Sequence, residues 1–152
     1  MDLRKDFFEI LCELAEKDKD VIFLTGDLGF SFYEEYAKRF PKQFINCGVA
    51  ESNMIGVVAG LALGGKKPIV YTCSTFYFRA LEQIRDEVCY NKLDVKLVGT
   101  GASPFLGFSH NIKDDEDIRT LSNFPNLKIF LPKNKKEIKK ALSGLGSAYV
   151  RL

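Results

Sequence analysis

The chain has 152 residues, of which 46% are hydrophobic and 28% are charged. This length and composition suffice for one globular domain with a buried core and argue against disorder. The net charge is +2, from 22 Lys and Arg against 20 Asp and Glu. So small an excess gives no reason to expect a nucleic acid or an anionic membrane as partner.

The apolar runs, the cysteines and the single histidine indicate what to expect of membrane spans, metal sites and cellular location. The longest apolar run, residues 54–63, is about half as long as a membrane-spanning helix, and the first residues lack the apolar core of a secretion signal. Cys12, Cys47, Cys73 and Cys89 occur singly, and His110 is the single histidine, which argues against a zinc site. We therefore expect no membrane span, no metal ligands, reduced thiols and a cytoplasmic location.

Apolar periodicity predicts helices and strands that alternate along the chain. In chain order these are helix 3–16, strand 21–24, helix 31–40, strand 44–47, helix 51–63, strand 69–73, helix 76–90, strand 95–98, loop 99–113, helix 114–123, strand 127–131, helix 133–142 and strand 148–152. Short, continuously apolar strands in such an alternation are typical of a parallel sheet covered on both faces. We expect a single doubly wound α/β domain over residues 1–152, with six mainly parallel strands.

The predicted helix 51–63 is rich in small residues. Gly56 and Gly60 share one face because they are four residues apart. Small side chains allow another backbone to approach closely. The neighbour can be a helix of the same domain or one of another subunit, and the spacing leaves both open.

In doubly wound sheets, ligands bind at the carboxyl ends of the strands. Those ends carry Asp27, Glu51, Phe76 and the loop that contains His110. No glycine-rich dinucleotide motif, Walker A motif or hydrolase elbow follows any predicted strand. Taken singly, Glu51 could merely favour the helix dipole, Phe76 could be packing, and His110 could be a surface residue.

Taken together and in order, several segments resemble one enzyme family. Residues 44–54, Phe-Ile-Asn-Cys-Gly-Val-Ala-Glu-Ser-Asn-Met, resemble the strand–glycine–glutamate–helix segment of transketolases. Residues 59–63, 67–70, 74–76 and 79–84 continue the match. Gly26-Asp27-Leu28 and Phe124-Pro125-Asn126-Leu127 also fit. The likeness covers nearly the whole chain and extends to the C-terminal subunits of split transketolases and to 1-deoxyxylulose-5-phosphate synthases. It concerns one domain, the pyrimidine-binding (Pyr) domain of thiamine diphosphate enzymes.

The resemblance implies roles for four residues at the cofactor. Glu51 would be the catalytic carboxyl that hydrogen-bonds N1′ of the aminopyrimidine and shares a proton with it. Phe76 would line the aminopyrimidine pocket. Arg79 falls where deoxyxylulose-phosphate synthases have arginine, so that it could meet the cofactor or a substrate phosphate. Asp27 resembles the acid that helps to couple paired sites at a subunit interface.

The resemblance is weaker on the substrate side. Ser31 falls near a serine that transketolases use on sugar phosphates, and His110 corresponds to the histidine that ends their Gly-Pro-Thr-His motif. That motif is replaced here by residues 107–110, Gly-Phe-Ser-His, and Leu106 occupies the place of an aspartate that reads a donor hydroxyl. A further substrate histidine is replaced near Gly99. An ordinary pentose-phosphate substrate is therefore less expected.

The family holds the diphosphate and its Mg²⁺ in a separate PP domain through a Gly-Asp-Gly … Asn motif, which this sequence does not contain. The resemblance thus implies half of a split enzyme that transfers a two-carbon ketol unit between sugars or sugar phosphates. It would need a PP-domain partner subunit and would form a homo- or hetero-oligomer. Two alternatives stay open: a synthase-like acyl transfer from pyruvate, and a non-catalytic Pyr domain that only binds a partner.

Overall fold

The computed structural model describes residues 2–101 and 110–152 and contains six strands. They are β1 (Val21–Thr25), β2 (Phe44–Asn46), β3 (Lys67–Cys73), β4 (Lys96–Thr100), β5 (Lys128–Phe130) and β6 (Ala148–Arg151). All neighbouring strands pair in parallel, in the order β2-β1-β3-β4-β6-β5. This confirms the predicted six-stranded parallel sheet.

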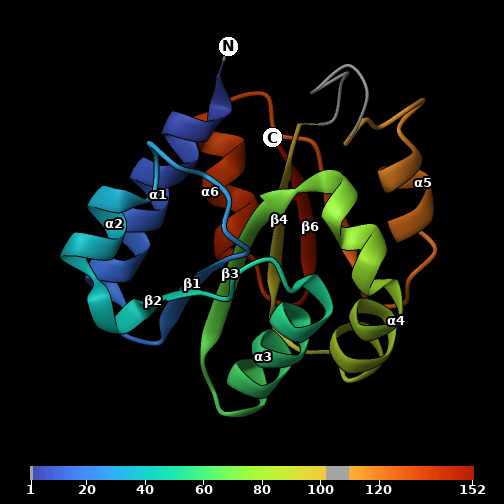
Figure 1. Ribbon diagram of the computed structural model, residues 1–152, viewed down its shortest axis with the longest axis horizontal. Coiled ribbons are helices and arrows are strands. Elements are labelled where there is room, and N and C mark those ends of the chain that lie inside the picture. The colour runs from blue at the N-terminus through green and yellow to red at the C-terminus, as the bar shows by residue number, and fades with distance from the viewer. Residues whose placement is uncertain (1, 102–109) are drawn as a thin grey trace.

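Helices cover both faces of the sheet (Figure 1). Their bounds are α1 (Leu3–Lys17), α2 (Glu34–Arg39), α3 (Glu51–Leu63), α4 (Leu81–Gln83), α5 (Glu116–Leu121) and α6 (Lys135–Ser143). α1, α2 and α6 pack on one face, and α3, α4 and α5 pack on the other. The domain is therefore doubly wound, as predicted. Among the described residues, no helix has the length and apolar character needed to cross a bilayer.

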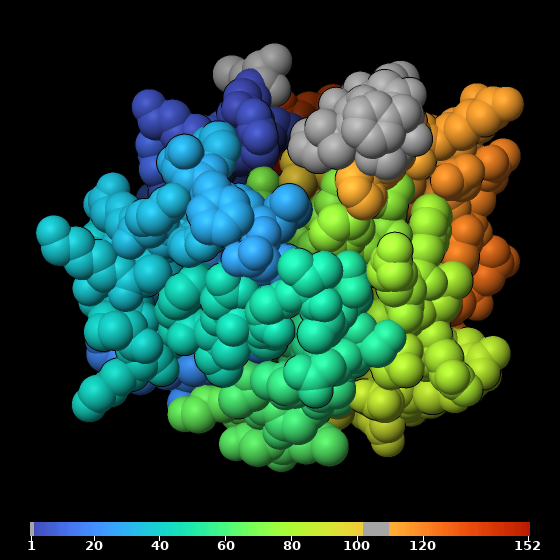
Figure 2. All heavy atoms as spheres, viewed as in Figure 1, coloured from blue at the N-terminus to red at the C-terminus, as the bar shows by residue number. Residues whose placement is uncertain are grey.

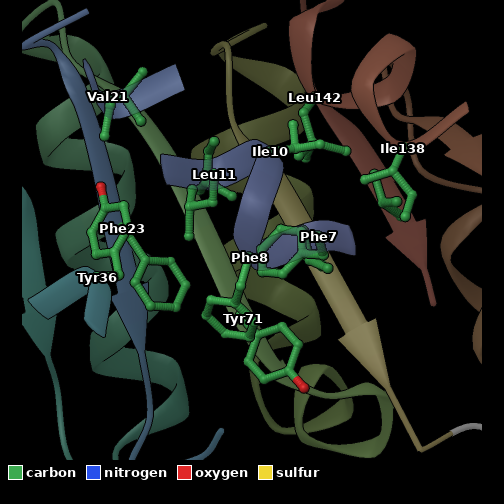
Figure 3. Close-up of a cluster of buried hydrophobic side chains, with 14 of the residues drawn as sticks. Phe7, Phe8, Ile10, Leu11, Val21, Phe23, Tyr36, Tyr71, Ile138 and Leu142 are labelled. Atoms are coloured by element: carbon green, nitrogen blue, oxygen red, sulfur yellow. The ribbon is translucent and has the colours of Figure 1, made fainter. Parts of the chain in front are cut away.

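The core under α1 is rich in aromatic side chains (Figure 3). Phe7 stacks on Tyr71 of β3, with ring centroids 5.4 Å apart, and Phe8 meets Phe23 of β1 edge-on at 5.6 Å. Offset and edge-to-face pairs of this kind add to the free energy gained by burying apolar area. They form because α1 carries its apolar residues at helical spacing, on the side that faces the sheet.

Three predicted helices differ from the observed ones. The predicted helix 114–123 is shortened to α5, and Asp114 and Asp115 before it have left-handed backbones, with φ 50° and 57°. The predicted helix 31–40 is reduced to α2, because Ser31 has a left-handed backbone, with φ 71°, and the helix cannot extend back through it. The predicted helix 76–90 is a series of three short helices: the 3₁₀ helix η2 (Ser74–Ala80), α4, and the π-helix η3 (Ile84–Tyr90). Apolar spacing of three to four residues does not distinguish these hydrogen-bonding patterns.

Candidate functional site

Glu51 is the first residue of α3, directly after the loop that follows β2. Gly48 lets the chain turn there, with φ 66°, a conformation that costs a residue with a side chain more than it costs glycine. The Glu51 side chain is only 12% exposed, and the Arg79 Nε lies 3.9 Å from its Oε1. No hydrogen bond to this carboxyl comes from the residues that the structure describes. The carboxyl is therefore largely shielded from water, and Arg79 is its charged neighbour.

The 3₁₀ helix η2 supplies the neighbouring side chains. It carries both Phe76 and Arg79, and the Ser52 Oγ of α3 donates a hydrogen bond to the Arg79 carbonyl oxygen at 2.7 Å. This bond holds the start of α3 against η2. The Arg79 side chain itself is 71% exposed and can reach a ligand outside the domain.

His110 lies against Phe76. Their ring centroids are 4.9 Å apart and the rings meet edge-on, at 75°. Glu51, Arg79, Phe76 and His110 thus form one continuous group at the carboxyl edge of the sheet, as expected if these ends carry the site. Leu106 and residues 107–109 lie outside the described residues.

Asp27 lies beside this group, in the loop after β1, and is tied to Asn46 at the end of β2. The Asp27 amide donates to Asn46 Oδ1 at 3.0 Å, and Asn46 Nδ2 donates to Asp27 Oδ1 at 3.3 Å. Sequence analysis missed Asn46. Its place at the last residue of a strand, two residues before a glycine, was a signal that could have found it, because asparagine side chains often bond the backbone of such turns.

Ser31 lies four residues after Asp27, in the same loop between β1 and α2. Its amide donates to Glu34 Oε1 at 2.8 Å, and it borders a cavity of about 730 Å³ between α1 and α2. Among the described residues, no hydrogen bond or ring contact joins Ser31 to Glu51, Phe76 or His110. The assignment of Ser31 to the substrate side stays a prediction.

Three of the predicted residues share an unusual backbone. Asp27, Ser31 and His110 have φ values of 58°, 71° and 55°, in the left-handed region that residues other than glycine rarely adopt. Such conformations cost free energy and persist where the surroundings enforce them, frequently at functional sites. This edge of the sheet is therefore a strained region as well as the location of the candidate carboxyl.

Sequence analysis also missed a buried polar network behind η2. The Tyr149 hydroxyl donates to Asp117 Oδ2 at 2.7 Å, and Arg151 Nη1 donates to Asp117 Oδ1 at 3.1 Å. Burial, together with the hydrogen bond to Asp117, raises the pKa of the Tyr149 hydroxyl. Because β6, α5 and η2 meet only in the folded chain, no local sequence pattern could have revealed the network.

The residues around Glu51 fit the aminopyrimidine end of thiamine diphosphate better than its diphosphate end. A shielded carboxyl and an aromatic ring, Phe76, suit an aminopyrimidine. Among the described residues, no group of three or more His, Cys, Asp or Glu could hold a metal ion, which a Mg²⁺–diphosphate would need. Neither the cavity between α1 and α2 nor one of about 230 Å³ beside β3 and α6 includes Glu51 or Phe76.

Fold and site together define a doubly wound α/β domain with a largely buried glutamate, Glu51, at the carboxyl edge of its sheet. The model of the family described as "Transketolase, pyrimidine binding domain" matches residues 1–145. The chain belongs to this family, and the resemblance seen in the sequence is confirmed.

Two curated relatives illustrate the range of the family. The chain is 38% identical, over 142 residues, to a subunit of the apulose-4-phosphate transketolase of Phocaeicola vulgatus, a match that covers 90% of this chain and 45% of the relative. It is 35% identical, over 157 residues, to the 1-deoxy-D-xylulose-5-phosphate synthase of Oleidesulfovibrio alaskensis, covering 95% and 24% respectively. The chain thus spans half or less of the length of these relatives.

A solved structure of a split-gene transketolase, described as an inactive beta4 tetramer, is similar over the same region. Its TM-score is 0.85 at 36% sequence identity, and the match covers 98% of this chain and 50% of that one. The backbone of this chain is therefore arranged like one half of that split-gene transketolase chain.

Proposed function

We propose that this chain is the pyrimidine-binding half of a thiamine diphosphate-dependent, transketolase-like enzyme. The enzyme would transfer a two-carbon ketol unit between sugars or sugar phosphates. The observation that carries the proposal is the Glu51 carboxyl, which is 12% exposed and free of hydrogen bonds from the described residues. It begins a helix at the edge of the sheet where ligands of such folds bind.

Each residue has a distinct task in this proposal. The bound cofactor supplies the carbanion chemistry. Glu51 holds a proton at the aminopyrimidine N1′, which requires a carboxyl within hydrogen-bonding reach of that atom. Phe76 packs against the ring. Asp27 supports the cofactor site at the subunit interface, and the exposed guanidinium of Arg79 binds the cofactor or a substrate phosphate.

The substrate side is assigned to His110 and Ser31. His110 is in contact with Phe76 and therefore adjoins the proposed ring site, which suits a role in substrate binding. Ser31 borders the cavity between α1 and α2, so that its assignment depends on the family resemblance alone.

A partner subunit completes the site in this proposal. It would carry the Gly-Asp-Gly motif, which binds the diphosphate and Mg²⁺. Support comes from the relative that is named as one subunit of a transketolase and from the tetramer that is described as inactive. The complex would be a homo- or hetero-oligomer in the cytoplasm.

The outer face of α3 is the surface on which the partner would dock. It is apolar and exposed: Leu63 is 71% exposed, and a Cβ on Gly60 would have no atom within 4 Å. Figure 2 shows α3, coloured teal to green, at the surface of the molecule. A helix that is apolar nearly all round is normally buried, so that a second subunit is expected to cover it.

A second candidate function is a synthase-like acyl transfer with pyruvate as donor. It is favoured by Arg79, which lies 3.9 Å from Glu51 at the place where the synthases have arginine. The third alternative, a non-catalytic domain, is disfavoured because Glu51 and Phe76 are both present. Glu51 lies beside Arg79 of η2, and Phe76 belongs to the same 3₁₀ helix.

Calorimetric titration with thiamine diphosphate and Mg²⁺ tests the proposal. The chain alone is expected to bind weakly or not at all, and binding is expected once a purified PP-domain subunit of a split transketolase is added. Gly60→Leu should fold but fail to assemble, whereas Gly60→Ala should assemble normally. A low-micromolar dissociation constant for the chain alone would contradict the split-site proposal.

A further inference from the structure

The carboxamide of Asn46 joins two loops that are far apart in the sequence. Its Oδ1 accepts hydrogen bonds from the amides of Asp27 and Gly48, both at 3.0 Å, and its Nδ2 donates to Asp27 Oδ1 at 3.3 Å. One side chain thus connects the loop after β1 to the loop between β2 and α3. Its orientation is set by these partners, because two N–H groups require an oxygen and a carboxylate requires a donor.

Both backbone positions that Asn46 holds are left-handed, with φ 58° at Asp27 and 66° at Gly48. An aspartate in this conformation is strained unless its surroundings maintain it. Asn46 supplies an acceptor for the amide of each residue. It therefore stabilises both left-handed positions at once.

The bond to Gly48 continues into α3 through the main chain. The Gly48 carbonyl accepts from the Ala50 amide at 2.9 Å, and the Ala50 carbonyl accepts from the Met54 amide at 2.8 Å, within the first turn of the helix. Glu51 follows Ala50 directly. Hydrogen bonds thus link Asn46 to the residue before the candidate catalytic carboxyl.

Little space exists for the two loops to move relative to each other. A Cβ on Gly26 would lie 3.3 Å from the Gly48 carbonyl oxygen, and the Cys47 amide donates to the Thr25 carbonyl at 2.8 Å. A shift of the loop that contains Gly48 would therefore change the separation between Asp27 and Glu51.

We propose that Asn46 is a positioning residue that sets the Glu51 carboxyl relative to Asp27. It acts through Gly48 and touches no reacting atom. That the separation between Glu51 and Asp27 matters for catalysis rests on the proposed function above. The positioning by Asn46 can itself be measured without cofactor, partner or substrate. An amide is needed because an aspartate at this place would put a second carboxylate beside Asp27, and an alanine would leave both amides with water in place of a fixed protein acceptor.

The test compares Asn46→Ala, Asn46→Asp and the exchanged pair D27N/N46D by NMR of the labelled chain. Asn46→Ala should raise hydrogen exchange of the Asp27 and Gly48 amides by about five- to tenfold, the effect of losing one hydrogen bond. The Cys47 amide, which bonds the main chain, should remain protected. The carboxyl carbon signal of Glu51 should move, while that of Glu137 on α6 should not.

Asn46→Asp should disturb the same signals, and D27N/N46D should restore them, because the exchanged pair again has one donor and one carboxylate. Asn123→Ala, at an exposed asparagine of similar type, is the matched control. In the assembled enzyme Asn46→Ala should lower kcat with little change in KM. Any one of three results would overturn the proposal. In Asn46→Ala, these are unchanged hydrogen exchange of the Gly48 and Asp27 amides or an unmoved carboxyl carbon signal of Glu51. In D27N/N46D, it is a set of signals as disturbed as in Asn46→Asp.

Discussion

Gly99→Ala is expected to disrupt the buried network behind η2. Gly99 is an interior residue of β4, and a Cβ there would lie 2.5 Å from the Tyr149 hydroxyl oxygen and 2.6 Å from the Ser74 Oγ. Neither contact can persist. Tyr149 is fully buried and donates to the equally buried Asp117, so that moving its ring disturbs a hydrogen bond to a carboxylate without access to water.

The magnitude follows from two contributions. Forcing a methyl group into a packed core typically costs about 1–3 kcal/mol, and weakening a hydrogen bond to a buried charge adds about 1–3 kcal/mol. The contributions overlap, because movement of the Tyr149 ring relieves the clash, so that we expect a total of about 2–4 kcal/mol. In a domain of this size such a loss lowers Tm by roughly 5–15 °C.

Urea unfolding of the chain, followed by far-UV circular dichroism, is a suitable assay because the chain has no tryptophan. Gly56→Ala on α3 is the matched control. Its Cβ would meet only Glu87 Oε2, at an ordinary 3.7 Å, and alanine favours a helix over glycine by up to about 1 kcal/mol. If Gly99→Ala unfolds at the same urea concentration as the wild type, the packing described around Tyr149 is incorrect.

Two further predictions concern His110 and the buried tyrosines. His110→Ala should raise KM or lower kcat in the assembled enzyme while leaving cofactor affinity nearly unchanged, and unaltered steady-state kinetics would make His110 a surface residue. Burial raises the pKa of Tyr36, Tyr77 and Tyr149 above the ordinary 10.0. Above pH 10 the folded state therefore retains tyrosine protons that the unfolded state loses. The free energy of unfolding should then fall as the pH rises, by up to about 1.4 kcal/mol per pH unit for each of these tyrosines, whereas below pH 10 their contribution is fully present. Urea unfolding at pH 9 and 11 should show this, with a smaller loss for Tyr77→Phe; equal stability at both values would refute it.

The fold was largely predictable because apolar periodicity reports burial. The predicted helix 51–63 agrees with α3 at both ends, and each of the six predicted strands is present. The division of residues 74–90 into 3₁₀, α and π turns was not predictable. All three place apolar residues every three to four positions, and tertiary contacts such as the Tyr77 hydroxyl to the carbonyls of Val70 and Val98 decide among them.

The candidate site was predictable to the extent that it follows the strand ends. Glu51, Phe76 and His110 come after different strands, and a parallel sheet brings those ends to one edge. Asn46 has one local partner, Gly48, and could have been found from its place two residues before that glycine. Tyr149 and Asp117 were missed because they are 32 residues apart in the chain and meet only through the order of the strands. A residue's type and local pattern do not contain that information.

The most direct test of the central claim is the C2 proton exchange of thiamine diphosphate bound to the complex of this chain with a PP-domain subunit. The rate is measured by quenching and NMR for the wild type, Glu51→Gln and Glu116→Gln, the last being another glutamate that begins a helix. Glu51→Gln should slow exchange by about 10²–10⁴-fold, the usual range for a general acid–base group. It should alter folding stability by no more than about 1 kcal/mol, and Glu116→Gln should exchange as the wild type does. Wild-type exchange in Glu51→Gln would contradict the account and leave Glu51 as a residue that only stabilises its helix.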